Sequence, residues 1–540
     1  MKHFRDERGQ ILVLAALSML LLLAFVALAT DVGLLFRAKR NAQIAADAAA
    51  VAGALDYKYN GSATSAEAAG QTASTANGIT NGASGAVVTV SEPPVDGPNR
   101  SSNGFVEAVV TQPNPTFFLG MFGHSLVSVS ARAVAGAGTT DGCVWALGRS
   151  GVDIPISGSG SINVPTCGVY DNSSASDALD LTGSGSIEAN SIGIVGSYKD
   201  SGSGSIKICN PTCTNGDPTT GIAPVASPIT LTPPTIPTGT ATAPSGSGSA
   251  FTCSGTSNCN VNPGTYSSIT NSGTGTLTFS SGIYNVTGNI ANTGSGKIVS
   301  GTGTYTFDVG GNINDSGSGA MTLGSGTYNI AGSINNSTSH VMTFGAGNYI
   351  VNGSITNAGS GGTAIGDGNV IVNGCLCDTG SGNITTGNGN YTMGTFTSSG
   401  SSSLTLGSGL YITTGNLSLT GSGGITGTNN TFYTEGSTTV SGSGSMDLEA
   451  PTSGTYNGIV FYQPANDNKS ISISGSGSMT LKGIVYAPDS QLTISGSGSN
   501  NVYTDFIVDS LYLSGSGSFN SKQYQLINAS ALLGKIVMVE

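Results

Sequence analysis

The chain has 540 residues, of which only 9% are charged and 83 are glycine, and its formal net charge is −12. About a quarter of the residues of an ordinary globular domain are charged, and glycine without a strict three-residue period excludes collagen. Nucleic acid is excluded as a partner, because phosphate binding needs clustered Lys or Arg and this acidic chain has no basic patch beyond its first 60 residues.

Residues 1–10 are polar and partly basic, and we expect them to form a cytoplasmic N-terminus. Residues 11–29 follow, and Ser18 is the only polar residue among them. A helix of this length spans a bilayer, so we predict a retained transmembrane helix. A cleaved secretory signal is the alternative, but its apolar core is shorter and precedes a small-residue cleavage site. Basic residues on both sides of the segment leave its orientation undecided.

Residues 41–55 are rich in alanine, the best helix former, so the helix should continue out of the membrane. Three motifs occur in order: Arg8-Gly9, then Asp31-Val32-Gly33 after the apolar segment, then an alanine run. This order resembles the N-terminal domain of Tad (tight adherence, Flp) pilus-assembly proteins of the TadE/TadG-like group. The residues that carry the resemblance are Gly9, Asp31, Ala42, Ala46, Asp47 and Ala48.

The resemblance implies a link to Tad pilus assembly, with the Tad machinery and pseudopilin-like proteins as partners. Pilin-like members of the group are cut after a glycine and carry Glu at the fifth residue beyond it. Here Gly9 is present but the fifth residue is Leu14, which puts prepilin processing and entry into a fibre in doubt. The likeness continues loosely to residue 138, where strands at 86–91, 105–112 and 125–135 and a short helix at 115–122 predict a small α+β unit spanning 30–138.

The chain has eight cysteines, all beyond the apolar segment. An even number in an exported region suggests disulfides. Their order allows four local pairs but does not fix the connectivity, and a zinc site is disfavoured because no paired Cys-x-x-Cys occurs. The cysteines are Cys143, Cys167, Cys209, Cys213, Cys253, Cys259, Cys375 and Cys377.

A glycine-led phrase, as in Gly326-Thr-Tyr328-Asn-Ile330, repeats about every 21 residues through the second half of the chain. Each unit contains three short alternating strands and three glycine-rich corners, which predicts a three-sided, right-handed parallel β-helix with inward Tyr, Ile, Val and Leu. A flexible Gly/Ser linker would lack these periodic apolar residues, and the leucine-rich-repeat pattern is absent. The fold class is therefore mainly β, and about sixteen coils would give a rod of roughly 75 Å.

We place the first coils at 139–217 and the main array at 246–528. Residues 218–245 contain seven prolines, which cannot donate to a ladder, so they are expected to form an extended linker or an insertion against the rod. The apolar residues 529–540 are expected to cap the open end of the array. Cys143, Cys167-Gly168 and the coils that follow are similar to long TadG-like proteins with a β-solenoid body.

No catalytic, cofactor or metal site is predicted. Asp315, Asp367 and Asp378 lie near corners, where Asp is ordinarily a turn residue, and a lone His340 is more often structural than catalytic. Six later acids stand in separate coils without a basic cluster, although calcium binding remains an alternative for them. These acids are Asp447, Glu449, Asp467, Asp489, Asp505 and Asp509.

The sequence thus predicts an exported structural or adhesive protein, anchored once in the bacterial inner membrane, with its body in the periplasm or at the cell surface. Surface glycans are a further expected partner. The alternative is a membrane-anchored β-helix that binds carbohydrate or cleaves polysaccharide. Three or more acidic side chains in one groove would favour this alternative, because such chemistry needs neighbouring carboxylates.

Overall fold

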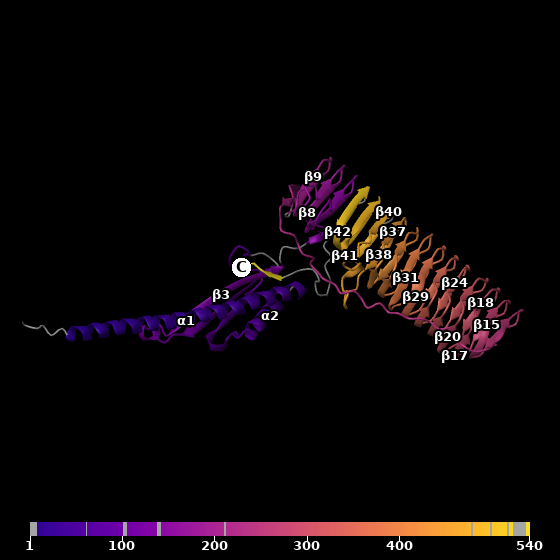
Figure 1. Ribbon diagram of the computed structural model, residues 1–540, viewed down its shortest axis with the longest axis horizontal. Helices are drawn as coiled ribbons and strands as arrows, with labels where there is room; N and C mark the ends of the chain where they lie inside the picture. The colour runs from indigo at the N-terminus through magenta and orange to yellow at the C-terminus, as the bar shows by residue number, and fades with distance from the viewer. Residues whose placement is uncertain are drawn as a thin grey trace, which may run out of the picture. The chain divides into compact units, whose positions relative to one another are not determined.

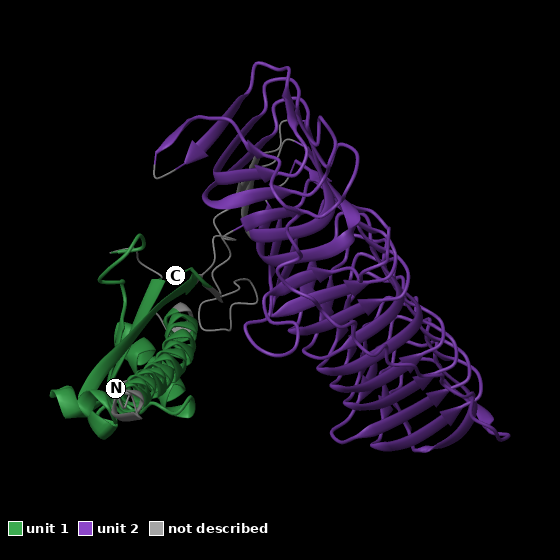
Figure 2. Cartoon of the chain, turned by 60° about the vertical axis from the view of Figure 1, so that its left-hand side comes forward, with its two compact units in different colours: residues 1–141, 528–540 green, residues 142–527 purple. Residues whose placement is uncertain are grey.

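The computed structural model describes residues 8–60, 62–100, 105–137, 142–209, 212–476, 479–496, 499–515, 518–521 and 536–539. The chain forms two compact units (Figure 2), one of residues 1–141 with 528–540 and the other of residues 142–527. Each unit has its own hydrophobic core. The fold is mainly β, with a long helix at the N-terminus (Figure 1).

Helix α1 (Arg8–Asn60) runs without interruption from the apolar segment through the alanine-rich run. The side chains from Leu12 to Leu28 that are large and apolar are exposed, whereas those of Ala42, Ala46 and Ala50 are buried. One helix therefore has two different environments along its length. Its first half has the length and composition of a membrane span, which a signal sequence shares.

The second half of α1 packs on a four-stranded antiparallel sheet ordered β1 (Val87–Ser91), β2 (Phe105–Pro115), β3 (Leu126–Ala137) and β44 (Ile536–Met538). Small alanine side chains let the helix approach the inward valines and alanines of the sheet closely. Helix α2 (Ala63–Ala76), which the sequence analysis did not identify, begins at the cap residue Ser62 and packs against α1. Two short 3-10 helices, η1 (Ala83–Gly85) and η2 (Leu119–Phe122), complete this unit.

The C-terminal strand belongs to this sheet. In β44, Met538 pairs with Ala135 of β3, so residues 536–538 extend the N-terminal sheet and do not cap the coils. Residues 529–535 lie outside the described residues, and a capping role for them stays a prediction. The two ends of the chain are thereby joined in one unit.

The second unit is a parallel β-solenoid in which equivalent residues of successive coils pair in register about 21 residues apart, as Tyr328 does with Tyr349. Three columns of strands run through it. The Thr column contains β14 (Cys259–Val261), β16 (Leu277–Phe279), β19 (Ile298–Ser300), β22 (Met321–Leu323), β25 (Met342–Phe344), β28 (Thr363–Ile365), β30 (Ile384–Thr386), β32 (Leu404–Leu406), β35 (Ile425–Thr428), β38 (Met446–Glu449), β43 (Ser518–Ser521) and β10 (Ser205–Cys209).

The Tyr column contains β17 (Gly282–Val286), β20 (Tyr305–Val309), β23 (Gly326–Ile330), β26 (Gly347–Val351), β33 (Gly409–Thr413), β36 (Asn430–Thr434), β39 (Ile459–Tyr462), β4 (Gly142–Ala146) and β12 (Thr219–Thr220). The Asn column contains β13 (Ser249–Cys253), β18 (Ile290–Asn292), β21 (Ile313–Asp315), β24 (Ile334–Asn336), β27 (Ile355–Asn357), β34 (Leu417–Leu419), β37 (Thr438–Gly442), β40 (Ile471–Gly475), β5 (Ile154–Ile156), β7 (Leu179–Leu181) and β9 (Tyr198–Asp200). Longer strands turn corners and serve more than one column: β6 (Ser161–Asp171), β8 (Ser186–Ile194), β15 (Gly264–Asn271), β29 (Gly368–Asp378), β31 (Tyr391–Ser398), β41 (Met479–Gly496) and β42 (Ser499–Gly515).

Aromatic rings stack along the inside of the Tyr column. The ring centroids of Tyr328 and Tyr349 are 4.5 Å apart, and those of Tyr391 and Tyr411 are 5.0 Å apart, with nearly parallel planes. Several buried hydroxyls donate to a carbonyl of the preceding corner, as Tyr411 does to Gly407 at 2.8 Å, whereas Tyr462 donates to the carbonyl of Leu231. The rings thus fill the core without leaving a buried polar atom unpaired.

The glycines that lead each repeat are required by close contact between coils. A Cβ on Gly347 would collide with the carbonyl oxygen of Gly326 in the neighbouring coil. At Gly389 the backbone has φ +150° in addition, a conformation that L side chains rarely adopt. Both reasons explain why glycine recurs at this place in successive repeats, where Tyr305 and Asn430 are exceptions.

The coils do not follow chain order along the solenoid. Strand β4 pairs with β42, and β6 pairs with β43, so the first coils of the chain stack on the last ones. One end of the array is therefore formed by residues near 249–261 and the other by residues near 205–220. At the second end β11 (Cys213–Asn215) folds back antiparallel on β10, which covers its open edge.

The proline-rich segment connects the two ends and lies along the solenoid (Figure 1). We call residues 221–248 the strap. Its backbone bonds to side chains of widely separated coils: Val225 to Asn172, Leu231 to the hydroxyl of Tyr462, and Ala241 to Asn352. The strap is thus an insertion that contacts the array along most of its length.

The cysteines form the four local disulfides among the alternatives, Cys143–Cys167, Cys209–Cys213, Cys253–Cys259 and Cys375–Cys377. The second bridge closes the β10–β11 hairpin, and the third lies in the first coil at the opposite end. Both terminal coils, each lacking a neighbour on one side, therefore carry a covalent crosslink.

A substitution at Ile330 tests the assignment of inward-facing residues in the array. This residue is buried and pairs in register with Val309 and Val351 of the adjacent coils. Ile330→Asp should lower the free energy of unfolding by several kcal/mol, because it buries an unpaired charge. The control is Thr327→Asp, which changes an outward residue of the same strand. Thermal melting and protease resistance that are equal in the two variants would contradict the assignment.

Candidate functional site

A row of polar side chains runs through the inside of the solenoid. In seven successive coils the strand of the Asn column ends in a buried amide, carboxyl or hydroxyl side chain that faces its equivalent in the next coil. Asn271 donates to the carbonyls of Gly275 and Lys297, both at 3.1 Å, so that one side chain bridges its own corner and the next coil. The row consists of Asn271, Asn292, Asp315, Asn336, Asn357, Asp378 and Ser398.

Two acids interrupt this row of amides. Asn292 donates to Asp315 at 3.1 Å, and Asn357 donates to Asp378 at 2.9 Å. The second carboxyl oxygen of each acid has no hydrogen-bond partner. Burial raises the pKa of Asp315 to about 6, against the opposing effects of the Asn292 amide, two backbone N–H groups and His340. Burial also raises the pKa of Asp378. Both acids lie at corners as predicted, but their side chains point into the core.

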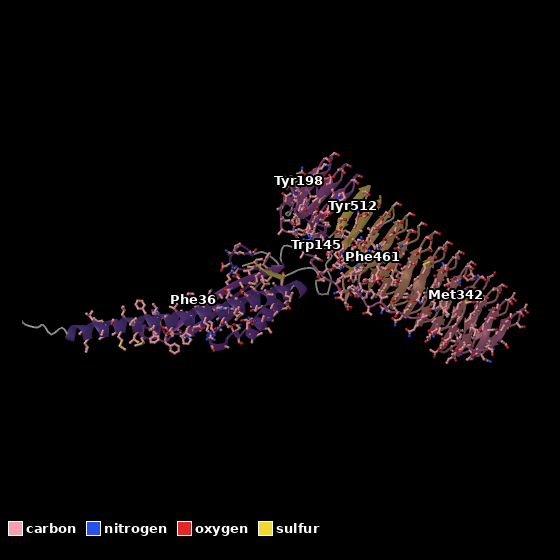
Figure 3. All side chains as sticks on the ribbon, in the orientation of Figure 1. Phe36, Trp145, Tyr198, Met342, Phe461 and Tyr512 are labelled. Carbon is pink, nitrogen blue, oxygen red and sulfur yellow. A yellow bond between two sulfur atoms is a disulfide. The ribbon has the colours of Figure 1, made fainter. Side chains whose placement is uncertain are left out.

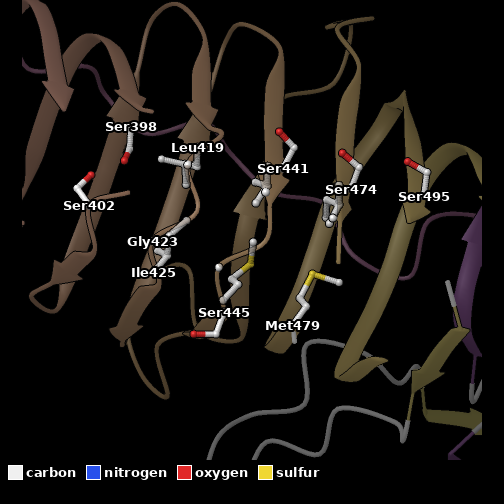
Figure 4. Close-up of a pocket in the computed structure, with 17 residues that line it drawn as sticks. Ser398, Ser402, Leu419, Gly423, Ile425, Ser441, Ser445, Ser474, Met479 and Ser495 are labelled. Carbon is white, nitrogen blue, oxygen red and sulfur yellow. The ribbon is translucent and has the colours of Figure 1, made fainter. Parts of the chain in front are cut away.

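The polar row ends at Ser398, and a small cavity begins there. Its volume is about 50 Å³, and it lies against the corners of the following coils (Figure 4). In these coils the equivalent positions are Leu419, Val440 and Ile473, which lack an amide to bond the corner carbonyls. The cavity is therefore a gap where the polar row stops, and it is lined by serine, glycine and apolar side chains rather than by a reactive group.

Three acids meet where the first coils stack on the last. Asp153 precedes β5, Asp171 ends β6, and Asp509 lies in β42. Burial and then the charges of Asp171 and Asp509 raise the pKa of Asp153 to about 8, and burial raises that of Asp171 to about 6. One oxygen of Asp153 and one of Asp171 have no hydrogen-bond partner. Because both side chains are buried, a sugar chain has no access to them in this conformation.

The other acids singled out from the sequence are dispersed. Glu449 forms an ion pair with Lys482 of the next coil at 3.4 Å, so the prediction that these acids have no basic partner is wrong for Glu449. Asp489 accepts a hydrogen bond from the backbone of Asn466. His340 is exposed, and its backbone carbonyl accepts from Asn336. Among the described residues, no three His, Cys, Asp or Glu side chains are placed to hold one metal ion.

In the first unit, Asp31 of α1 holds the tip of the β2–β3 hairpin. Its buried carboxylate accepts hydrogen bonds from the backbone N–H groups of Phe117 and Phe118, each at 2.9 Å, and of Leu119 at 2.7 Å. These donors lie at the start of η2, where backbone N–H groups lack partners within a helix. Asp31 thus joins the end of the apolar segment to a loop almost 90 residues away.

The alanine motif forms the helix side of the same interface. Ala42 and Ala46 are buried against the sheet, whereas Ala48 is only partly buried. Asp47 accepts from Gln43 at 2.7 Å, and Gln43 also donates to the carbonyl of Arg132 in β3 at 3.0 Å. The side chains around Gly9 are outside those that the structure describes, so a role for Gly9 stays a prediction. The motif therefore fixes α1 on β3.

Residues 9–56 match the family model described as "Putative Flp pilus-assembly TadE/G-like". The match covers the apolar segment, Asp31 and the alanine motif, which are the features on which the resemblance in the sequence rests. No curated protein and no solved structure matches the chain. The relation to the Tad family thus rests on α1, and the solenoid lies outside the matched residues.

Asp315 gives the polar row a pH dependence. Its pKa is about 6 in the folded chain and 3.8 ordinarily, so between these values the unfolded chain loses a proton that the folded chain keeps. Stability must fall as pH rises through this window, by at most about 3 kcal/mol, and stay constant above it. Asp315→Asn should remove this loss and raise the melting temperature more at pH 7.5 than at pH 4. Asp308→Asn, on the outside of the same coil, is the control. A stability difference between Asp315→Asn and wild type that is the same at both pH values would contradict the prediction.

Proposed function

We propose that this is an exported structural protein of a Tad pilus-assembly or surface-attachment system, anchored once in the bacterial inner membrane by residues 11–29. Both units would lie outside the cytoplasm, in the periplasm or at the cell surface. The Tad machinery and pseudopilin-like proteins are the proposed partners, and the solenoid, with a right-handed coil, is proposed to act as a spacer or adhesive surface.

The continuity of α1 carries this proposal. The apolar segment leads without a break into the alanines that form the core of the first unit. Cleavage after the apolar segment, as for a signal sequence, would cut this helix next to Asp31, which holds the β2–β3 hairpin. A retained anchor keeps the helix and the unit intact.

The disulfides support the proposed location. Four bridges lie in the solenoid, and disulfides persist in oxidising compartments outside the cytoplasm. The match to the pilus-assembly family at residues 9–56 supports the proposed system.

The anchor is tested on the full chain expressed in bacteria. We expect the protein in the membrane fraction, with peptides from residues 11–29 detected by mass spectrometry. Protease added to spheroplasts should digest the chain beyond about residue 31, whereas an intact outer envelope should protect a periplasmic body. A mature N-terminus near residue 31 would refute the anchor, and one at Gln10 would show pilin-type processing.

The outward face of the Thr column supports an adhesive role. Hydroxyl side chains recur in register along this face at a coil spacing of about 4.8 Å, interrupted by Val299 and Ala364, and they can form hydrogen bonds to a glycan or to another rod. Few charges interrupt this face, and Asp447 is one of them. Its threonines are Thr278, Thr322, Thr343, Thr385, Thr405 and Thr426.

Attachment of cells to a surface tests this face. The triple variant Thr322→Lys, Thr343→Lys and Thr385→Lys should reduce attachment severalfold with little change in melting, because the three side chains point outward. A matched triple variant on the Tyr column, at Thr327, Asn348 and Asn369, keeps the added charge but moves it to another face. If cells with the Thr-column variant attached as well as wild-type cells, the adhesive role of this face would be refuted. The solenoid would then be proposed to act only as a spacer.

The second candidate function is a sugar-binding or polysaccharide-cleaving module, which the three acids at the coil junction favour. Burial of Asp153 and Asp171 weighs against it, because acid/base chemistry needs contact with the substrate. We therefore propose that the protein is not an enzyme. Glycan cleavage by the purified protein that Asp171→Asn abolishes without unfolding would reverse this conclusion.

A further inference from the structure

The tip of the β2–β3 hairpin exposes large apolar side chains. The tip consists of residues 116–125 with Leu126, the first residue of β3. Met121 and Phe122 of η2 are 82% and 83% exposed, and Phe117 and Leu126 are also exposed. Four such side chains within one turn region form a patch of the kind that marks an interaction surface in soluble domains.

The position of the tip along the axis of α1 is fixed, and we call its distance past Ala29 along this axis its height. The three hydrogen bonds of Asp31 hold its backbone against the helix, two residues beyond Ala29. At a rise of 1.5 Å per residue, Asp31 lies about 3 Å past the end of the apolar segment. From there the hairpin runs back along α1, where Lys39 donates to the carbonyl of Ser130 in β3.

This height matches the polar boundary of a bilayer. The headgroup region on each side of the hydrocarbon core is about 5–8 Å thick. The tip therefore falls within it when residues 11–29 span the core. The exposed side chain of Phe36 lies next along the helix (Figure 3). The basic cluster that begins at Arg37 is about 12 Å past Ala29, just outside this headgroup region.

We propose that the tip of the β2–β3 hairpin inserts into the outer boundary of the bilayer beside the membrane helix and forms a second contact with lipid. This inference rests on the proposed anchor, because the height of the tip is measured from the span. The lipid surface is the occupant that the geometry favours, since Asp31 holds the exposed apolar tip beside α1 just past the exposed apolar residues of the span. Apolar and aromatic side chains inserted to a few ångströms bind a protein to a membrane interface.

Two contacts would fix the orientation of the first unit. A single helix can tilt and rotate in the bilayer, and its anchors set both angles. Asp31 is then a positioning residue, because it sets the height and direction of the tip without touching lipid itself. Replacing it should release the tip while the membrane helix remains in place.

The test uses the full chain in phosphatidylethanolamine/phosphatidylglycerol vesicles whose acyl chains are brominated near the headgroups, with tryptophan fluorescence as the readout. The variants are Phe122→Trp at the tip, Phe25→Trp within the span and Val95→Trp as the distant control. Val95 is exposed on the same unit, and its backbone binds Glu107, eight strand residues or about 27 Å from the end of β2. The signal of Trp145, which lies buried in the solenoid, is subtracted using the parent protein.

We expect emission from Phe122→Trp to shift to shorter wavelength and to lose intensity in brominated relative to unbrominated vesicles, as Phe25→Trp does, with no change for Val95→Trp. Adding Asp31→Ala to Phe122→Trp should restore its intensity, whereas adding it to Phe25→Trp should not. Quenching of Phe25→Trp without quenching of Phe122→Trp overturns the lipid contact and leaves the anchor intact. Absence of quenching at both positions overturns the anchor and, with it, the inference.

Discussion

In-register pairing of each coil with its neighbours is the constraint on which the solenoid depends. A residue in one coil faces its equivalent in the next at about 4.8 Å, so each position must suit a stack of its own kind. Tyr328 therefore lies on Tyr349, Asn335 bonds to Asn314, and Gly347 faces the carbonyl of Gly326. A side chain that fits one coil but not its neighbour disturbs two interfaces.

In-register pairing also explains which features of the solenoid could be predicted from the sequence. Stacking imposes a period, and the recurring glycines and tyrosines reveal both the coil length and the parallel pairing. The inward position of Asp315 and Asp378 was not readable, because Asp at a corner is compatible with a turn that faces either water or the core. The order of the coils was not readable either. The edges of coils with similar Gly-Ser-Gly corners are alike, and nothing in the sequence of β4 distinguishes β42 as its partner.

In the first unit, the helix and the strands followed from composition and alternation, whereas the contacts between them did not. Asp31 occurs in a family motif, but its partners at Phe117 to Leu119 are brought to it only by the fold. Helix α2 was missed because its alanine, serine and threonine residues give no clear apolar stripe. The pairing of β44 with β3 joins the two ends of the chain across more than 390 intervening residues, a relation that local patterns do not contain.

The strap limits how the repeat array can change its size. From Gly221 to Gly248 it can reach about 87 Å as an extended chain of about 3.1 Å per residue, and the sixteen strands of the Tyr column span about 72 Å. Near-identical repeats readily gain or lose copies by recombination, and an open solenoid accepts such changes at either end. Here each added coil lengthens the path between β12 and β13 by about 4.8 Å, so only about three extra coils would exhaust the slack. Copy number in this array is therefore tied to the length of a segment that is not itself a repeat, and the two must evolve together.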